Sequence, residues 1–385
     1  MLAYAAGQRY KSINRMPESE LRKMKKAMLA LWITLSLSMS CLSALADVPV
    51  AGKKVAYIIN MAESDIFTQC AEGFAQTAEK LGMMGEAFFS GGDDARFKSL
   101  VTTCAEQGFD GLFLSHGGED YAYGFLSGLL ARYPKLKLVT FDTRFVDASG
   151  CECAIPGVTQ FFQDDAGLAE SLLHYACAVI APDQRPVKVL KVWVGDYIAA
   201  FDRRDVGYQK YEADGRIVTV ETIAPADFAD AEASMHAVMK QTLTKYDEAD
   251  IDVVWVAYDA YARGCYRAIM ESEKRIPLVS VDICGQDAEY MLAADSVWKA
   301  CACTDFRANG EQGARILALE LAGEYGSIVD QRTGAPTAYI EMPATLITAE
   351  HLSGGDDTLL SNAPDSYGDV KNYVTCDWLR QSIGY

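Results

Sequence analysis

Short apolar runs rich in β-branched and aromatic residues alternate with amphipathic stretches of helical period along most of this chain. In the first half, the runs predict strands at Val55 to Ile59, Gly85 to Phe89, Gly111 to Leu114 and Leu136 to Phe141. The stretches between them predict helices at Phe67 to Leu81, Asp94 to Gln107 and Tyr121 to Tyr133. This order is typical of βαβ units around a parallel sheet.

The same rhythm restarts in the second half of the chain. Strands are predicted at Val187 to Val194, Ile217 to Thr222, Val253 to Ala257, Leu278 to Val281 and Val297 to Cys301. Helices are predicted at Asp164 to Ile180, Ala200 to Ala213, Asp227 to Tyr246, Tyr258 to Lys274 and Gln286 to Ala294. Two wound sheets in tandem follow from this repetition.

A helix at Phe306 to Ala322 and an extended segment at Tyr339 to Thr348 come after the second set of elements is complete. If they return to the first half, the chain crosses between the halves several times and forms a hinge. We therefore expect an α/β protein with two doubly wound, Rossmann-like parallel-sheet lobes joined by a multi-segment hinge. Residues 47–163 with 305–340 would form the N-terminal lobe, residues 164–304 with 341–352 the C-terminal lobe, and residues 353–385 a C-terminal extension.

Residues 1–46 contain the pattern of an export signal. Met24-Lys25-Lys26 leads into an apolar run from Ala27 to Leu45, which closes with the small-residue site Ala44-Leu45-Ala46. We expect cleavage before Asp47, a start at Met24 behind a patternless upstream segment, and a periplasmic mature protein. The alternatives are a membrane anchor, although four serines dilute the run, and a lipoprotein acylated at Cys41.

The charge of the mature chain limits its partners. Cleavage before Asp47 removes seven of the 35 Lys and Arg and two of the 53 Asp and Glu, which leaves a net charge of −23. A chain this acidic is not expected to bind nucleic acid or an anionic membrane surface.

The cysteines do not have the spacing of metal ligands. The pairs Cys151 with Cys153 and Cys301 with Cys303 are C-x-C motifs without a nearby histidine, and no metal site is expected. Because export leads to an oxidising compartment, disulfides are possible. A bridge between Cys70 and Cys104 on successive predicted helices is one option, and free buried cysteines are the other.

Residues that follow the predicted strands are the candidates for a binding site, because ligands of wound sheets meet the carboxyl ends of the strands. They combine carboxylates, arginine and aromatic rings, which suits a neutral, hydroxyl-rich ligand: carboxylates accept from hydroxyls, arginine donates, and aromatic faces cover a sugar ring. An Asp at such a position also caps the following helix, an alternative that stays open for Asp259. The candidates are Asn60, Asp65, Phe67, Ser115, His116, Asp142, Arg144, Asp196, Tyr197, Phe228, Tyr258, Asp259, Asp282 and Thr304.

Sequence signatures of catalysis and cofactor binding do not occur where they are expected. No G-x-G-x-x-G follows the first strand, and the chain contains no G-x-S-x-G elbow and no G-x-x-x-x-G-K-[ST] loop. The segment Ser115-His116-Gly117-Gly118 resembles an oxyanion-hole motif, but the sequence contains no nucleophile elbow that would supply the attacking residue. We expect no cofactor and no catalytic residue.

Several segments together resemble the periplasmic sugar-binding proteins of the ribose-binding type, the solute receptors of ABC importers. The resemblance covers roughly residues 53 to 350, and its strength lies in the order and spacing of its parts. The segments are Val55-Ala56-Tyr57-Ile58-Ile59-Asn60 with Phe67 and Glu72-Gly73-Phe74, Phe109-Asp110-Gly111-Leu112, Val139-Thr140-Phe141-Asp142-Thr143-Arg144, Gln163-Asp164-Asp165-Ala166-Gly167, Pro225-Ala226-Asp227-Phe228, Ala257-Tyr258-Asp259, Val279-Ser280-Val281-Asp282 and Pro343-Ala344-Thr345-Leu346-Ile347-Thr348.

The resemblance implies the type I periplasmic binding fold and roles for single residues. In the first lobe, Asn60 and Phe67 would line the wall, and Asp142 with Arg144 would bind ring hydroxyls. From the second lobe, Phe228 would stack on the ligand.

Asp282 of the second lobe would accept hydroxyls of the ligand. Other positions of this lobe match the family less closely, and Tyr258 stands where an amide is common. Asp202 or Arg203 takes the place of a usual arginine, and Thr304 that of a polar residue, often Gln. These departures leave the identity of the sugar open.

We therefore expect a monomeric periplasmic receptor that binds a small sugar or polyol between two lobes and docks on an ABC permease in the inner membrane. One rival is a ligand-presenting accessory of a membrane sensor kinase or chemoreceptor, which would use the same closed lobes. The other rival is an enzyme on the same scaffold, which the missing signatures disfavour.

Overall fold

The computed structural model describes residues 48–195, 198–329, 335–352 and 376–383 of the 385-residue chain. The expected export signal, the candidates Asp196 and Tyr197, and most of the C-terminal extension lie outside these residues. In the part of the chain that is described, no helix has both the length and the apolar character needed to cross a membrane.

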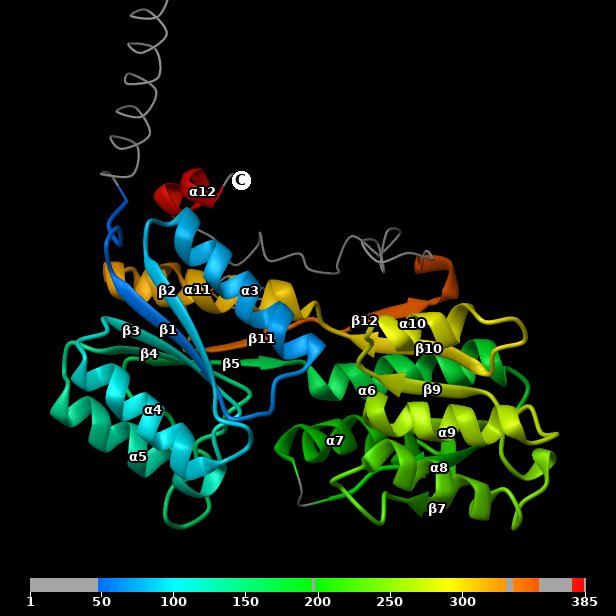
Figure 1. Ribbon diagram of the computed structural model, residues 1–385. Helices are drawn as coiled ribbons and strands as arrows, with labels where there is room; N and C mark the ends of the chain where they lie inside the picture. The colour runs from blue at the N-terminus through cyan, green and yellow to red at the C-terminus, as the bar shows by residue number, and fades with distance from the viewer. Residues whose placement is uncertain (1–47, 196–197, 330–334, 353–375, 384–385) are drawn as a thin grey trace, which may run out of the picture. The chain divides into compact units, whose positions relative to one another are not determined.

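Two six-stranded sheets form the framework (Figure 1). The first has the order β11 (Tyr339–Met342), β5 (Val158–Gln163), β4 (Lys137–Phe141), β3 (Gly111–Ser115), β1 (Lys54–Ile59) and β2 (Met84–Phe89), with every pair parallel. The second has the order β12 (Thr345–Thr348), β10 (Trp298–Cys303), β9 (Leu278–Val281), β8 (Val253–Val256), β6 (Val187–Val192) and β7 (Ile217–Ile223). Only β12 is antiparallel to its neighbour. The predicted fold class is confirmed.

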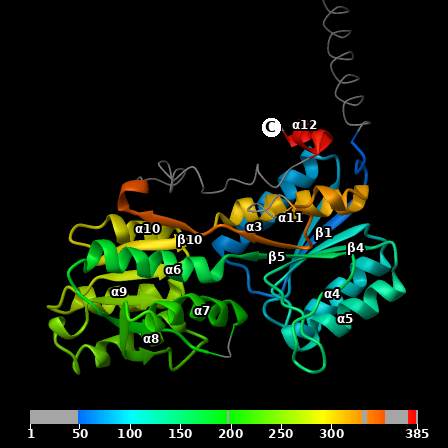
Figure 2. The ribbon, with the colours of Figure 1, turned by 180° about the vertical axis from the view of Figure 1, so that it is seen from behind.

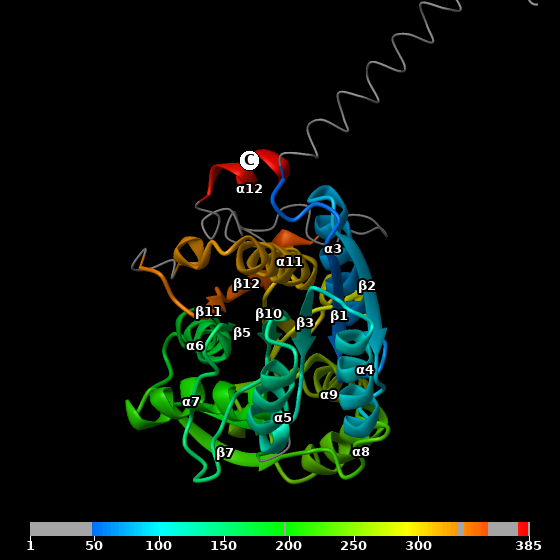
Figure 3. The same cartoon turned by 90° about the vertical axis from the view of Figure 1, so that its left-hand side faces the viewer.

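Helices cover both faces of the first sheet. The chain moves from β1 outward to the edge strand β2 and then back across β1 to β3. Because these two connections run in opposite directions along the sheet, their helices lie on opposite faces. As Figure 3 shows, α3 (Asp65–Lys80) and α11 (Phe306–Ala322) lie together on one side, and α4 (Asp94–Glu106) and α5 (Glu119–Arg132) on the other. Both faces of the strands are therefore buried, which explains their nearly continuous apolar sequences.

The second sheet repeats this arrangement. On one side, α6 (Asp165–Tyr175) packs against α7 (Ala199–Ala213), as Figure 2 shows from behind. The returning helices α8 (Ala231–Thr242), α9 (Asp259–Glu271) and α10 (Gly285–Leu292) follow the opposite winding direction. Short elements complete the described chain: the π-helix η1 (Ala176–Ile180), the 3₁₀ turns η2 (Glu248–Asp250), η3 (Tyr325–Ser327) and η4 (Ala349–His351), and α12 (Asp377–Ile383).

Two glycines allow α3 and α11 to approach each other closely. A Cβ at Gly73 would collide with the carbonyl oxygen of Arg307, and a Cβ at Gly310 with that of Cys70. Only glycine permits backbones to touch in this way. The close contact fixes the start of α11 beside the first sheet, and with it the position of Phe306, the first residue of the helix.

The chain passes between the two sheets three times: from β5 to α6, from β10 to α11, and from β11 to β12. The extended segment predicted at Tyr339 to Thr348 is therefore two strands that belong to different sheets. Buried side chains tie the first two passages together, because Thr304 Oγ1 donates to Gln163 Oε1 over 2.9 Å and accepts from Asn309 Nδ2. This is the multi-segment connection that the sequence predicts.

A bridge between Cys70 and Cys104 is ruled out by the winding of the first sheet. Both cysteines are free and buried. Cys70 lies on α3 and Cys104 on α4, which cover opposite faces of the sheet. The other described cysteines are free as well, so the alternative of small buried hydrophobes holds for most of them.

Candidate functional site

Three residues at strand ends have left-handed backbone conformations. His116 after β3, Asp142 after β4 and Asp282 after β9 have φ values of 60°, 50° and 67°. Their N–H groups still continue the sheet, since they donate to the carbonyl oxygens of the neighbouring strands over 2.9–3.0 Å. A positive φ is uncommon for residues other than glycine and tends to cluster at functional sites. In the described chain only one further non-glycine residue, Asp295, shares it.

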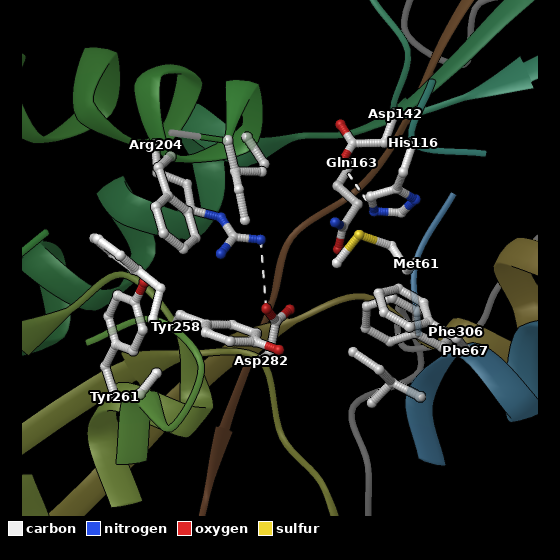
Figure 4. Close-up of a pocket in the computed structure, with 16 residues that line it drawn as sticks. Met61, Phe67, His116, Asp142, Gln163, Arg204, Tyr258, Tyr261, Asp282 and Phe306 are labelled. Atoms are coloured by element: carbon white, nitrogen blue, oxygen red, sulfur yellow. Dashed lines mark ion pairs between the residues drawn. The ribbon is translucent and has the colours of Figure 1, made fainter. Parts of the chain in front are cut away.

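These three side chains line one cavity of about 220 Å³ between the lobes (Figure 4). The first lobe contributes strand-end and helix-start residues: Met61, Ile66, Phe67, His116, Asp142, Gln163 and Phe306. The second lobe contributes Ile198, Ala200, Phe201, Arg204, Phe228, Ala231, Tyr258, Tyr261 and Asp282. The volume lies below the 300–1,000 Å³ of pockets for drug-sized ligands, so the cavity suits a small molecule.

Aromatic rings form a wall on each side of the cavity. In the first lobe, Phe67 meets His116 and Phe306 edge to face, with ring centroids 5.2 and 6.2 Å apart. In the second lobe, Tyr258 packs against Phe201 and Tyr261 at 6.0 and 5.5 Å. Because the rings hold one another in place, they present preformed apolar surfaces to a ligand.

A chain of alternating charges runs beside the cavity from one lobe to the other. Arg203 Nη2 pairs with Asp142 of the first lobe, and its Nε donates to Asp165 Oδ2 of the second lobe over 2.8 Å. Arg204 continues the chain, because its Nε donates to Asp165 Oδ1 over 3.0 Å and its Nη2 lies 3.4 Å from Asp282 Oδ2. The carboxylates that face the cavity are thus held and partly neutralised by arginines.

His116 is neutral in this setting. Burial, together with the positive charges of Arg203 and Arg204, lowers the pKa of His116 to about 3. Its Nδ1 lies 2.6 Å from Ser115 Oγ, and its Nε2 lies 3.3 Å from Asp142 Oδ2. The proton therefore belongs on Nε2, where it faces the carboxylate, while Nδ1 accepts from the serine.

Burial acts on the carboxylates in the opposite direction. It raises the pKa of Asp165 to about 7 and that of Asp282 to about 6, although Arg204 lowers both. Asp282 is only 3% exposed, and its Oδ1 has no hydrogen-bond partner among the described residues. A buried acceptor left unpaired costs free energy, so this oxygen is a natural place for a ligand hydroxyl.

The Arg203 pair gives a testable contribution to lobe closure. We expect Arg203→Met to shift the ligand-free protein toward a more open arrangement, because Asp142 would then be buried without its cationic partner, and opening restores its hydration. Small-angle scattering without ligand should show a larger radius of gyration. The control is Lys210→Met on the same helix, whose partner Glu170 lies in the same lobe. Equal radii for both variants and the parent would contradict this role.

Six of the fifteen predicted site residues line the cavity: Phe67, His116, Asp142, Phe228, Tyr258 and Asp282. Three others contact lining residues from behind. Ser115 faces His116, Arg203 holds Asp142, and Thr304 donates to Gln163. A role in binding stays a prediction for all nine.

The remaining candidates are engaged elsewhere or not described. Asn60 donates to Asp94 and accepts from Ser90, and Arg144 pairs with Glu119 over 2.7 Å. Asp65 is exposed in the first turn of α3, and Asp259 pairs with Arg263 at the start of α9. Asp196 and Tyr197 lie outside the described residues.

Several lining residues are absent from the predicted set. Most of them, including Ile66, Phe201, Tyr261 and Phe306, lie in the first turn of a helix that follows a strand. The signal that these residues share in the sequence is a position in the first helical turn after a strand. Gln163 ends β5, a strand that the sequence analysis does not predict.

One cluster in the described chain has the spacing of metal ligands, formed by Asp259, Cys284 and Asp287. The guanidinium of Arg263 already occupies its centre. Arg263 Nη1 lies 3.0 Å from each carboxylate and 3.4 Å from the sulfur. Because the arginine supplies the positive charge, the cluster fits a structural ion pair that anchors α9 to the start of α10.

The two α/β lobes with their parallel-dominated sheets match the type I periplasmic binding fold of solved structures. A sugar ABC transporter protein from Yersinia enterocolitica subsp. enterocolitica 8081 is 27% identical, covers 88% of this chain and 96% of its own, and superposes with a TM-score of 0.71. The 5-methylthioribose transporter solute-binding protein of Thermotoga lettingae was solved with 5-methylthioribose and is 24% identical to this chain. The match covers 86% of this chain and 98% of the Thermotoga protein, with a TM-score of 0.69.

More distant solved structures share the same fold. A periplasmic ribose ABC transporter protein of Conexibacter woesei is 16% identical over 78% of this chain and 93% of its own, with a TM-score of 0.64. No protein-family model and no curated protein matches the sequence. The likeness to solute-binding proteins of ABC transporters therefore rests on the structure.

Proposed function

We propose that this protein is an exported solute receptor, which binds a small sugar or polyol between its lobes and delivers it to an ABC permease. The observation that carries the proposal is the convergence of His116, Asp142 and Asp282 on one cavity from both lobes, each in a left-handed conformation. Carboxylates and aromatic walls are the groups that bind hydroxyls and the faces of a sugar ring.

Similarity supports the same role. The Yersinia neighbour is a sugar ABC transporter protein, and others were solved with 5-methylthioribose, allitol or glycerol bound. The signal pattern at Lys25 and Ala44 to Ala46 supports export to the periplasm. We also propose that the protein acts as a monomer, with residues 47–163 and 305–340 as one lobe and residues 164–304 and 341–352 as the other.

A thermal-shift screen over sugars and polyols tests the binding function. A ligand present at 100 times its Kd stabilises the folded protein by about 2.7 kcal/mol, so we expect at least one member of the panel to raise Tm by several degrees. Amino acids of similar size serve as the control panel and should leave Tm unchanged. Stabilisation by an amino acid, and by no sugar or polyol, would contradict the proposal.

A further inference from the structure

We infer that the ligand is a small sugar or polyol that carries one apolar substituent in place of a hydroxyl. The inference rests on the proposed function and narrows its substrate class. It follows from two properties of the cavity: few polar atoms are left for ligand hydroxyls, and the second lobe adds an apolar surface larger than a sugar ring requires.

The charged lining residues are already engaged with one another or with neighbours behind the wall. Seven of the sixteen described lining residues carry polar side-chain atoms: His116, Asp142, Gln163, Arg204, Tyr258, Tyr261 and Asp282. Arg204 uses its guanidinium on Asp165, on the Ala257 carbonyl and on Asp282. Asp142 is held by Arg203 and faces His116, whose other ring nitrogen faces Ser115.

Few polar atoms of the described lining remain for a ligand. Asp282 Oδ1 has no partner, Gln163 accepts from Thr304 through its Oε1 and keeps its Nε2, and Tyr258 adds a hydroxyl that can donate or accept. The engaged carboxylates keep some further acceptor capacity. A ligand with a hydroxyl on every carbon would leave some hydroxyls buried and unpaired, which costs affinity for each one.

The second lobe supplies the apolar surface for the substituent. Ile198, Ala200, Phe201 and Ala231 come from the starts of α7 and α8, and they line the same cavity as Tyr258 and Tyr261, which Figure 4 labels. Phe228 lines the same cavity and is still 42% exposed. One aromatic ring per face is enough to cover a sugar, so the additional apolar side chains favour a ligand with an apolar group to bury.

Calorimetry with purified full-length mature protein, freed of co-purified ligand, tests the inference. The probes are D-ribose, its 5-methylthio derivative and adenosine, which share the pentose and differ in the substituent. We expect at least one substituted pentose to bind at least tenfold more tightly than ribose, because each buried methylene is worth a factor of about four in affinity. The two substituted probes distinguish an alkylthio group from a flat heterocycle.

A variant locates the substituent. Phe228→Ala should weaken the tighter substituted pentose about tenfold and ribose by a smaller factor, so that the preference for the substituent shrinks. Leu292→Ala is the matched control, because this exposed leucine on α10 lies outside the cavity lining. It should change neither affinity.

Each outcome bears on a different claim. Equal or tighter binding of ribose, or of an unsubstituted polyol such as xylitol, would overturn the inference and leave the proposed function in place. An unchanged preference in Phe228→Ala would show that the substituent does not lie on the second-lobe wall and would overturn this placement of the substituent. Binding of no sugar, polyol or substituted pentose would overturn the proposed function and the inference together.

Discussion

Asp282→Asn is expected to lower ligand affinity roughly ten- to hundredfold while the protein stays folded. The substitution removes the charge of the buried acceptor Oδ1, which has no partner among the described residues. A hydrogen bond to a charged group is worth about 1.5–3 kcal/mol, which corresponds to that loss in Kd. Arg204 keeps its bonds to Asp165 and to the Ala257 carbonyl, so the network beside the cavity persists.

Asparagine is the right replacement because the backbone of Asp282 is left-handed, with a φ of 67°. Asn tolerates this conformation, whereas Ala would add backbone strain to the loss of the carboxylate. Asp295→Asn is a matched control, since Asp295 has a φ of 58° but is exposed and lies outside the cavity lining. Calorimetry should give parental affinity for the control. Parental affinity for Asp282→Asn as well would remove this carboxylate from the ligand site.

The fold could be predicted from the sequence because its strands are buried on both faces. Strands such as β1 and β8 read as continuous apolar runs, and the helices between them carry one apolar face. The strand β5 escapes this pattern. Its Thr159 and Gln163 are polar yet buried, because Thr159 donates to Glu320 and Gln163 accepts from Thr304. Such partners are distant in sequence and leave no local signal.

The site could be predicted in part, for a geometric reason. Side chains directly after a strand point to the carboxyl edge of the sheet, so His116, Asp142 and Asp282 could be found by position alone. A helix that begins after the strand also turns its first residues toward the same edge, and which of them face the cavity depends on its rotation. Arg203 and Arg204 show this: neighbours on a helix differ by 100°, and only Arg204 lines the cavity.

Engagement with other side chains is the second limit on prediction. Asn60 and Arg144 follow strands, as a ligand residue would, but they spend their polar groups on Asp94 and Glu119. Each of these partners comes from a helix of the same lobe. Sequence position specifies which edge of the sheet a residue occupies, whereas the packing of nearby helices decides whether a ligand can reach it.

Glu320→Gln is expected to make stability less dependent on pH and to raise it most at alkaline pH. Glu320 on α11 is fully buried, its Oε1 accepts from Thr159 N and Oγ1 over 3.1 and 2.6 Å, and its Oε2 has no partner in the described chain. Burial raises the pKa of Glu320 to about 8. The folded protein therefore holds this proton at neutral pH, whereas the unfolded chain releases it with a pKa of about 4.3.

Because the pKa of Glu320 is higher in the folded than in the unfolded protein, its contribution to stability falls as the pH rises. The stability that the protonated carboxyl contributes is complete below about pH 4.3 and is lost as the pH rises toward the folded-state pKa of about 8. Glutamine keeps the acceptor for Thr159 and cannot ionise, so the free energy of unfolding of the variant minus that of the parent should grow with pH. The upper limit is about 1.4 kcal/mol per pH unit, which amounts to several kcal/mol between pH 5 and pH 8.

Urea unfolding of both proteins at each half pH unit from 5 to 8 measures this difference directly. Other groups that titrate in the range, such as Asp165 and Asp282, are present in both proteins, so their contributions cancel in the subtraction. Glu324→Gln, at an exposed position just beyond α11, controls for the removal of a surface charge and should give a nearly flat difference. If the difference in unfolding free energy for Glu320→Gln were also independent of pH, water would reach this carboxylate, and the contact between α11 and β5 would be more open than its packing indicates.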